Sequence, residues 1–336
     1  MRILFKLSQY NQQRQHEKLT WIFPIYLAMY ATALRNQGNE ICWDTMGTEV
    51  LKSEHWDKII TSESQIDIPF LKLPHADRIL TNAKNPKWQR NGNFKYLPGC
   101  YLMSASGCWW SKCSFCVEKS NYEVRPVEDV ISEIEECKAL GYRECFDDSA
   151  TFPVGNWSDS FCGGLIERRN KLVLGCNMRM VNADFLQMKA AGFRNLLFGL
   201  ESANEITLNR INKGTKVGDI EYIIKASKYG LEPHIAAIVG FPWEDYDDTM
   251  RTINLVKWLL VKGYAKTAQM SFYTPPKNQE QGNEEYRKYV TKFYEVGFYP
   301  EFWYNRLINI KSMDDLNYLI KGVQKGFSAL LTRRLT

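Results

Sequence analysis

From Cys100 onward, the sequence alternates between short apolar segments typical of buried strands and longer segments with helical periodicity. The expected strands are residues 101–104, 143–146, 171–176, 195–200, 234–239 and 266–273. The expected helices are residues 127–140, 159–169, 218–229 and 246–261, and one further helix that Asn182 caps and Gly192 stops. Strands that alternate with helices at this spacing predict a parallel α/β fold, either an open doubly wound sheet or a barrel.

Residues suited to ligand binding follow these strands at the points where the strands end. They are Asp147, Asp148, Arg179, Glu201, Gly240 and, within the last strand, Gln269. Open α/β sheets and barrels both bind ligands at the carboxyl ends of their strands. The sequence therefore predicts one active face in either fold.

The N-terminal part reads as a separate βαβ unit. A strand at residues 3–7 is followed by a helix that starts after Pro24 and ends before Gly38, and by a strand at 40–43. Short strands are also expected at 59–60 and 66–68, and C-terminal helices at 284–294 and 313–325. The expected domains are a βαβ domain at 1–73, a polar, turn-rich linker at 74–98, an α/β core at 99–280 and a helical extension at 281–336.

Cysteine content and charge exclude several classes of protein. Nine cysteines in 336 residues cannot all pair and do not suit a small disulfide scaffold. The net charge of +5 is too small to indicate nucleic-acid binding. The most apolar stretch, 21–34, is too short to span a bilayer, and no targeting segment is recognised. We expect a cytoplasmic protein without a membrane or nucleic-acid partner.

The strongest chemical signal is GCWWSKCSFC at residues 107–116, which places Cys108, Cys113 and Cys116 on one loop. A zinc site would normally need a fourth ligand, for which Cys100 is a candidate because no histidine is nearby in the sequence. A [4Fe-4S] cluster held by three cysteines leaves one iron open to a substrate or cofactor. The plain structural alternative is three core thiols, which the intervening tryptophans, serine and lysine disfavour.

This loop resembles the cluster loop of the radical S-adenosylmethionine (radical SAM) enzymes, with one extra residue in the first gap. Phe115 occupies the family's aromatic position before the last cysteine. Four later segments are similar to family segments that follow successive strands: DDSATFPVG, NMRMV, LLFGLESAN and IAAIVGFPWED. The resemblance covers roughly residues 98–275 and implies a partial (βα)6 TIM-like barrel.

The resemblance also implies ligands. Cys108, Cys113 and Cys116 would bind three irons of a [4Fe-4S] cluster, and the fourth iron would bind S-adenosylmethionine. The cofactor-binding residues would be Phe115 against adenine, Asp147 and Asp148 toward the methionine ammonium, Arg179 toward its carboxylate, Glu201 and Ser202 at the ribose, and Gly240 in a close backbone turn. For each of these the structural alternative is an ordinary core, turn or surface residue. His234, Cys42, Cys137, Cys145, Cys162 and Cys176 are expected to be structural.

The implied activity is reductive cleavage of S-adenosylmethionine and abstraction of a substrate hydrogen atom by a 5′-deoxyadenosyl radical. The substrate would be a peptide or a small molecule, methyl transfer is one of the candidate reactions, and a flavodoxin or ferredoxin would supply the electron. The alternative is a non-catalytic iron–sulfur protein that transfers electrons or acts as a sensor.

The N-terminal segment PIYLAMYATALRNQGNEICWDT resembles the start of the cobalamin-binding domains that precede this barrel in one branch of the family. The Asp-x-His-x-x-Gly motif of those domains is absent, and the segment is too short for a full five-stranded domain. We therefore expect a shortened, cobalamin-free remnant in preference to a cobalamin site.

Overall fold

The computed structural model describes residues 1–7, 23–44, 55–89, 92–116, 121–275 and 280–332. Its N-terminal unit is a three-stranded parallel sheet in the order β2-β1-β3, formed by β1 (Arg2–Lys6), β2 (Glu40–Asp44) and β3 (Lys58–Ile60). Helix α2 (Ile25–Asn36) connects β1 to β2, and Gly38 follows it with a φ of +85°. Nine residues of α2 are buried, so the helix packs on both sides. The expected βαβ unit is confirmed.

Residues 66–68, expected as a short strand, do not form one. They follow a 3₁₀ turn, η2 (Glu63–Gln65), and precede a second, η3 (Phe70–Lys72). The Gln65 side chain accepts hydrogen bonds from the backbone of Thr61 and Ser62, which closes the first turn locally. The strand was predicted only because Ile66 and Ile68 alternate with a polar residue. Local hydrogen bonds of the Gln65 side chain stabilise a turn here instead.

The polar segment between the two units is packed against the barrel. It contains the short helix α3 (Pro86–Gln89), and both Trp88 and Phe94 are fully buried. The Gln89 side chain exchanges two hydrogen bonds with the backbone of Gly99, at 2.7 and 2.9 Å. Composition suggested a linker because these few large apolar residues are diluted by polar neighbours.

The main sheet has six parallel strands whose spatial order follows the chain. They are β4 (Gly99–Leu102), β7 (Glu144–Asp147), β8 (Val173–Met178), β9 (Phe193–Glu201), β10 (Glu232–Val239) and β11 (Thr267–Phe272). When each new strand is added at the same edge of the sheet, right-handed crossovers put all the connecting helices on one face. In a doubly wound sheet the direction of strand addition reverses once, which puts helices on both faces. Since β4 and β11 are the two edges, this is the partial (βα)6 barrel that the resemblance implied.

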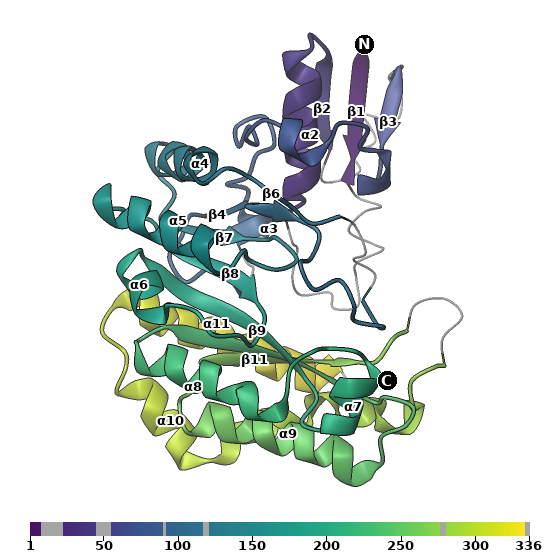
Figure 1. The fold of residues 1–336 in the computed structure, drawn as a ribbon, viewed down its shortest axis with the longest axis vertical. Helices are drawn as coiled ribbons and strands as arrows, with labels where there is room; N and C mark the ends of the chain where they lie inside the picture. Colours follow the sequence, from purple (N-terminus) through teal and green to yellow (C-terminus); the bar gives the residue numbers. More distant parts are fainter. Residues whose placement is uncertain (8–22, 45–54, 90–91, 117–120, 276–279, 333–336) are drawn as a thin grey trace.

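The connecting helices cover the outer face of this sheet (Figure 1). They are α4 (Val127–Ala139), α5 (Asn156–Glu167), α6 (Phe185–Ala190), α8 (Ile220–Lys228) and α9 (Tyr246–Val261). The short helix α7 (Glu205–Arg210) lies between β9 and α8 in the chain, and its Leu208 packs near Phe241. The cap of α6 is Asp184, which accepts from the backbone N–H of Gln187, and not the expected Asn182. Helix α7 was missed because it is short, and the antiparallel pair β5 (Ala105–Ser106) and β6 (Glu123–Val124) also lacks a sequence signal.

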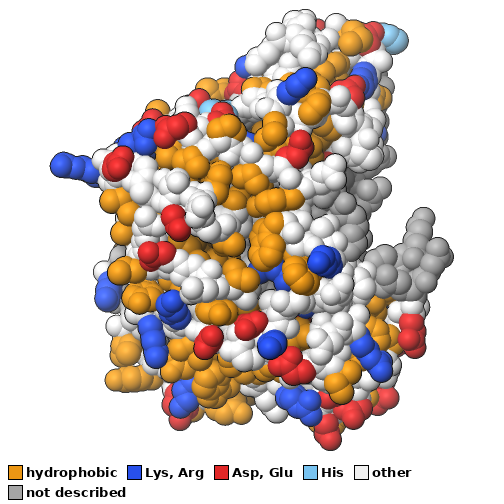
Figure 2. All heavy atoms as spheres, in the orientation of Figure 1, with side chains coloured by type: hydrophobic (Ala, Val, Ile, Leu, Met, Phe, Trp, Pro, Cys, Tyr) orange, Lys and Arg blue, Asp and Glu red, His pale blue; other side chains and the backbone are white. Residues whose placement is uncertain are grey.

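The C-terminal part consists of a 3₁₀ segment, η5 (Glu284–Phe298), and helices α10 (Pro300–Leu307) and α11 (Met313–Thr332). Within the ranges described, no helix is both long enough and apolar enough to cross a bilayer. On the face drawn in Figure 2, acidic and basic side chains are interspersed rather than gathered in one block of a single sign. That distribution agrees with the small net charge.

Candidate functional site

The residues predicted for the active face come together at the carboxyl ends of the strands. Asp147 and Glu201 are the last residues of β7 and β9, and Gly240 directly follows β10. Arg179 directly follows β8, and the cysteine loop follows β4. A single end of the partial barrel therefore carries all the predicted site residues.

The cysteine loop is held by the segment that follows α7. The backbone N–H of Ser114 donates to the carbonyl of Ile211 at 2.9 Å, and the indole N–H of Trp110 donates to the carbonyl of Asn212 at 2.8 Å. The half-buried Phe115 packs against a small apolar cluster that contains Ile211 and Phe241. These contacts hold the loop against the residues that follow α7 and against Phe241, which comes shortly after β10.

The three loop cysteines are not gathered around one point. Cys113 is buried, and Cys108 and Cys116 are half-buried. Among the described residues, the one group of three candidate ligands with all ligand atoms within 4.8 Å of one another is Cys100, Cys137 and Cys145, in a different place. Thiolates that share a single zinc ion at 2.3 Å lie about 3.8 Å apart, whereas thiolates on three corners of a cluster lie farther apart. The structure therefore places Cys100 with Cys137 and Cys145, and it does not bring the three loop sulfurs to the close spacing of a single zinc ion.

Arg179 connects the loop to the barrel. Its guanidinium lies 5.1 Å from the ring centre of Trp109 and 4.8 Å from that of Trp110, and Nη1 lies 4.0 Å from the Cys113 sulfur. Its Nη2 donates to the carbonyl of Lys213. The side chain is buried, and its Nε has no hydrogen-bond partner among the residues described. One donor of this arginine is thus left over for a ligand.

Glu201 is paired with Lys213, a residue that the sequence analysis missed. The Lys213 Nζ lies 2.5 Å from the Glu201 Oε1, and both side chains are largely buried. The same Nζ lies 6.0 Å from the ring centre of Phe115. Glu201 adopts a φ of +63°, in the left-handed region that a residue with a side chain occupies at a cost. Gly214 in the sequence NKGT, residues 212–215, indicates a turn. Nothing in the sequence indicates that the side chain of Lys213 is buried against Glu201.

Asp147 is used to build the turn after β7. Its Oδ1 accepts from the backbone N–H groups of Ser104 and Ser149 and from the Ser149 hydroxyl. Burial raises the pKa of Asp147, and these hydrogen bonds only partly offset that effect. Asp148 is half-buried, and its backbone N–H donates to the carbonyl of Leu102. Of the two, Asp148 has the more accessible side chain.

Tyr122 is a second residue that the sequence analysis missed. Its hydroxyl is buried with no hydrogen-bond partner among the residues described. Burial raises the pKa of Tyr122, and the charges of Asp147 and Cys108 raise it further. The phenol therefore lies near both the cysteine loop and the end of β7.

Ser202 and Gly240 have structural contacts. The Ser202 hydroxyl donates to Glu244 at 2.7 Å, and burial raises the pKa of Glu244. Gly240 has a φ of +82°, and a Cβ there would lie 2.4 Å from the Phe272 ring. A larger residue at position 240 would thus be both strained and obstructed. Gln269 is exposed on β11, and His234 lies within 2.8 Å of the Thr267 hydroxyl, as expected for a structural histidine.

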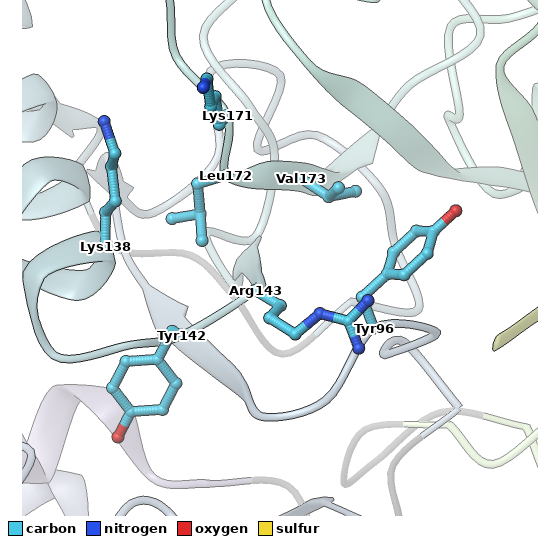
Figure 3. A pocket seen from close by; sticks show the side chains of 7 residues that line it. All are labelled: Tyr96, Lys138, Tyr142, Arg143, Lys171, Leu172 and Val173. Atoms are coloured by element: carbon cyan, nitrogen blue, oxygen red, sulfur yellow. The ribbon is translucent and has the colours of Figure 1, made fainter.

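A cleft of about 300 Å³ lies elsewhere, at the opposite ends of the strands (Figure 3). It is lined by Arg143 and Lys171, which precede β7 and β8, and by Lys138 of α4. Arg143 is already paired with Asp314 at 2.7 Å. Because the predicted chemistry gathers at the carboxyl ends, this cleft is not part of the candidate site.

Comparison with known proteins matches residues 103–256 to the model of the radical SAM superfamily. These residues run from the end of β4 into α9 and contain the cysteine loop, Asp147, Arg179, Glu201 and Gly240. No curated protein sequence is detectably similar to this chain.

Several solved structures are similar to part of this chain. The radical S-adenosylmethionine methyltransferase TsrM from Kitasatospora setae is 19% identical, with a TM-score of 0.49 over 62% of this chain and 42% of that one. The cobalamin-dependent S-adenosylmethionine radical enzyme OxsB is 16% identical, with a TM-score of 0.47 over 81% and 42%. Methylornithine synthase (PylB) is 13% identical, with a TM-score of 0.47 over 73% and 74%.

The chain spans less than half the length of TsrM and OxsB, and none of these similarities indicates an activity. The family match rests instead on the sequence of residues 103–256, which contains the cysteine loop and the four inner strands of the sheet, β7 to β10. Residues 103–256, just under half of the chain, are thus a domain that matches the radical SAM superfamily.

Proposed function

We propose that this protein uses a [4Fe-4S] cluster to cleave S-adenosylmethionine reductively and to abstract a hydrogen atom from a peptide or small-molecule substrate. The observation that carries the proposal is the loop with Cys108, Cys113 and Cys116, fixed at the carboxyl ends of the barrel strands within the matched domain. Three thiolate ligands leave one iron of such a cluster open.

Two buried polar groups support the fit of a charged cofactor beside this loop. The Nε of Arg179 and the hydroxyl of Tyr122 lack hydrogen-bond partners among the residues described. Buried donors without partners are costly, and a ligand that accepts from them removes that cost. A carboxylate is the natural partner of the guanidinium.

The proposed roles of the other residues follow from their positions. Phe115 would pack against adenine, and Asp148 with Asp147 would accept from the ammonium group. Glu201, Ser202 and Gly240 would line the ribose and adenine side. Since Glu201 is paired with Lys213, the lysine would hold the carboxylate in place for the ribose hydroxyls.

When bound, the cluster would supply one electron that divides the sulfonium into methionine and a 5′-deoxyadenosyl radical, which takes a hydrogen atom from the substrate. A flavodoxin or ferredoxin would supply that electron. The chain's own residues would position the cofactor and substrate and exclude water. Methyl transfer is one candidate for the steps that follow.

We also propose the domain division 1–73, 74–98, 99–280 and 281–336, with the first domain a shortened, cobalamin-free relative of cobalamin-binding domains. The three-stranded sheet β2-β1-β3 is smaller than the five-stranded domain that such a site needs. Absorption spectra of the protein mixed with hydroxocobalamin and then desalted test this directly. Retained, stoichiometric cobalamin would contradict it.

The activity is tested by anaerobic reconstitution with iron and sulfide, followed by dithionite and S-adenosylmethionine. We expect about four irons per chain and release of 5′-deoxyadenosine, both lost in Cys113→Ala and retained in the matched core variant Cys162→Ala. The electron-transfer alternative predicts a fully ligated cluster, whose electron paramagnetic resonance signal would not change when S-adenosylmethionine is added.

A further inference from the structure

A second group of cysteines lies between the barrel and its first helix. Cys100 on β4 and Cys145 on β7 are directly opposite each other in the parallel register, and Cys137 is on α4. Their neighbours Tyr101 and Phe146 contact each other with ring centres 6.1 Å apart. Since successive strand residues point to opposite faces, Cys100 and Cys145 both point toward the opposite face, where Cys137 meets them.

The spacing of these sulfurs suits a single metal ion. All three lie within 4.8 Å of one another, and each residue is at most 2% exposed. Three thiolates on one ion at about 2.3 Å lie about 3.8 Å apart, so small side-chain movements close the site. An all-sulfur set selects soft ions and not Mg²⁺ or Ca²⁺, which prefer oxygen ligands.

The surrounding buried charges favour an anionic group here. Arg78 and Arg125 both pair with Glu133, at 2.7 and 2.5 Å, and all three side chains are at most 2% exposed. Arg125 also reaches Asp129, whose side chain is 44% exposed. Two guanidinium groups thus share one fully buried carboxylate. Three thiolates with a divalent ion carry a net charge of −1, which would balance the fully buried groups Arg78, Arg125 and Glu133 when the half-exposed Asp129 is not counted.

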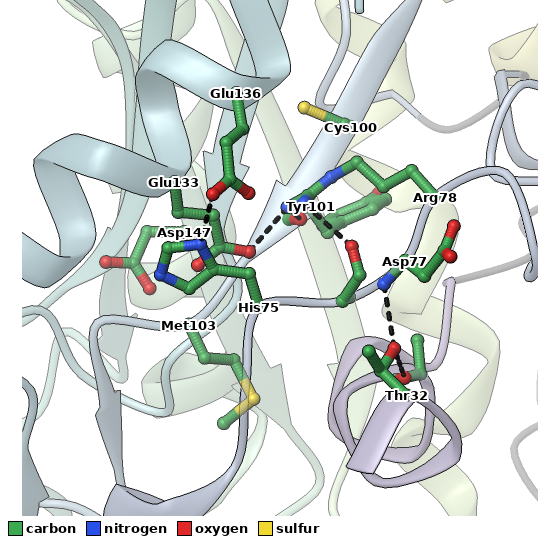
Figure 4. A network of polar contacts seen from close by, with 12 residues as sticks. Thr32, His75, Asp77, Arg78, Cys100, Tyr101, Met103, Glu133, Glu136 and Asp147 are labelled. Carbon is green, nitrogen blue, oxygen red and sulfur yellow. Dashed lines mark hydrogen bonds and ion pairs between the residues drawn. The ribbon is translucent and has the colours of Figure 1, made fainter. Parts of the chain in front are cut away.

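Arg78 joins this network to the cysteines. Its Nε has no hydrogen-bond partner among the residues described, and Figure 4 shows Cys100 beside its side chain. Burial opposes ionisation of Cys100, but hydrogen bonds with Cys137 and Cys145 and the charge of Arg78 outweigh it and lower the pKa of that thiol. The hydrogen bond with Cys100 raises the pKa of Cys137, and burial raises that of Cys145, so the case for a metal site rests on the spacing of the three sulfurs.

A cleft of about 520 Å³ lies on the outer side of this group, although none of the three cysteines lines it. Its lining includes Arg78, His75 and Asp77, and also Glu136 and Ala139, which are on the same stretch of α4 as Cys137. His75 lies 2.9 Å from Glu136 and 3.1 Å from Asp129. The cleft therefore places imidazole and carboxylate groups next to the buried network that contacts the cysteines.

We propose that Cys100, Cys137 and Cys145 bind one thiophilic divalent metal ion, of the Zn²⁺ and Cd²⁺ class, at a site separate from the cysteine loop. All three sulfurs bind as thiolates, so each cysteine that is still a thiol releases its proton to solvent, and no electron is transferred. The ion joins β4, β7 and α4, the first βα unit of the barrel.

The test uses the full-length chain with Cys108, Cys113 and Cys116 all changed to alanine, so that the loop cannot bind metal. Titration with Cd²⁺ alone, followed by its sulfur-to-metal charge-transfer absorption, should saturate at about one ion per chain. Adding Cys137→Ala or Cys100→Ala should weaken binding at least tenfold. Adding Cys162→Ala, a buried thiol outside the group, should leave it unchanged.

Thermal unfolding separates loss of the site from loss of the fold. Cd²⁺ should raise the unfolding temperature of the background protein and of its Cys162→Ala form, and should not change that of a folded Cys137→Ala form. Absence of a stoichiometric absorption band, or equal Cd²⁺ affinity with and without Cys137, would overturn the proposal. Both results are independent of the iron cluster, because the loop cysteines are absent.

Discussion

At the scale of single residues, Glu201 combines two unfavourable features at the proposed ribose site. It is a buried carboxylate, and its φ of +63° belongs to a region that costs about 1–3 kcal/mol for a residue other than glycine. Such a conformation persists only where the surroundings impose it. The ion pair with Lys213 is the contact that does so here.

Replacing Lys213 by methionine should therefore destabilise the protein. The Glu201 carboxylate would remain buried without its cation, which costs about 3–5 kcal/mol in free energy of unfolding. Urea unfolding measures the change, and Lys216→Met, at an exposed lysine in the same loop, should cost less than about 0.5 kcal/mol. If Lys213→Met and Lys216→Met unfolded at the same urea concentration, the pair would not stabilise the fold.

Glu133 should make stability depend on pH. Burial opposes its ionisation, but the charges of Arg78 and Arg125 outweigh that effect and lower the pKa of Glu133 to about 2. A depressed pKa adds stability above the usual value of 4.5, and this contribution is lost as the pH falls toward 2. The stability difference between the unchanged protein and Glu133→Gln should thus shrink from pH 5 to pH 3. The exposed Glu135→Gln should show no such trend.

At the scale of elements, the cysteine loop is fixed by a close contact at Gly214. This glycine has a φ of +67°, and a Cβ there would lie 2.0 Å from the Trp110 ring. Gly214→Ala should displace the loop and reduce the iron bound after reconstitution. Gly218→Ala is the matched control, since a Cβ there would meet nothing within 4 Å. Equal iron content in the two variants would show that Trp110 does not position the loop.

Helix α11 closes the amino ends of the barrel strands. The Asp315 carboxylate pairs with the buried Lys95, which also contacts Glu232 at the start of β10, and the Tyr318 hydroxyl donates to the carbonyl of Gly92. Lys95 and the Ser312 hydroxyl lower the pKa of Asp315 to about 2 despite burial. Helix α11 therefore packs against the residues that precede the barrel strands.

The two neighbouring aspartates of α11 give a matched comparison. Asp315→Asn should lower the free energy of unfolding by about 1–3 kcal/mol, because it leaves Lys95 with one carboxylate partner. Asp314→Asn breaks a more exposed pair with Arg143 and should cost at most about 1 kcal/mol. Faster amide hydrogen exchange in α11 should accompany the first change alone. A larger loss from Asp314→Asn would contradict this order.

Element types were predictable where local periodicity determines them. The bounds of α9 match the expected 246–261, and all six barrel strands lie within a few residues of their predicted positions. Contacts between distant residues were not predictable. Lys213 reaches Glu201 across twelve positions, and Trp88 is buried by tertiary packing in a segment whose average composition is polar. The site residues were predictable because they lie at strand ends. Their partners lie in loops, where the sequence has no hydrophobic periodicity that would indicate them.

At the scale of the whole molecule, the N-terminal unit and the barrel share one hydrophobic core. The buried cluster that contains Phe5 and Leu27 continues into Tyr101 and Val256. Across the junction, Phe23 and Trp88 contact each other with ring centres 5.5 Å apart. Two units that share a core are expected to unfold together.

Thr32 allows this coupling to be tested. Its hydroxyl accepts from the backbone N–H of Asp77 at 2.8 Å and donates to the carbonyl of Ala28. Thr32→Val keeps the volume but leaves the Asp77 N–H without this acceptor, at a cost of about 1–3 kcal/mol. Because the core is shared, tryptophan fluorescence and far-ultraviolet circular dichroism should report one unfolding transition, shifted as a whole to lower urea. A variant in which the two signals separated would show that the N-terminal unit unfolds independently of the barrel.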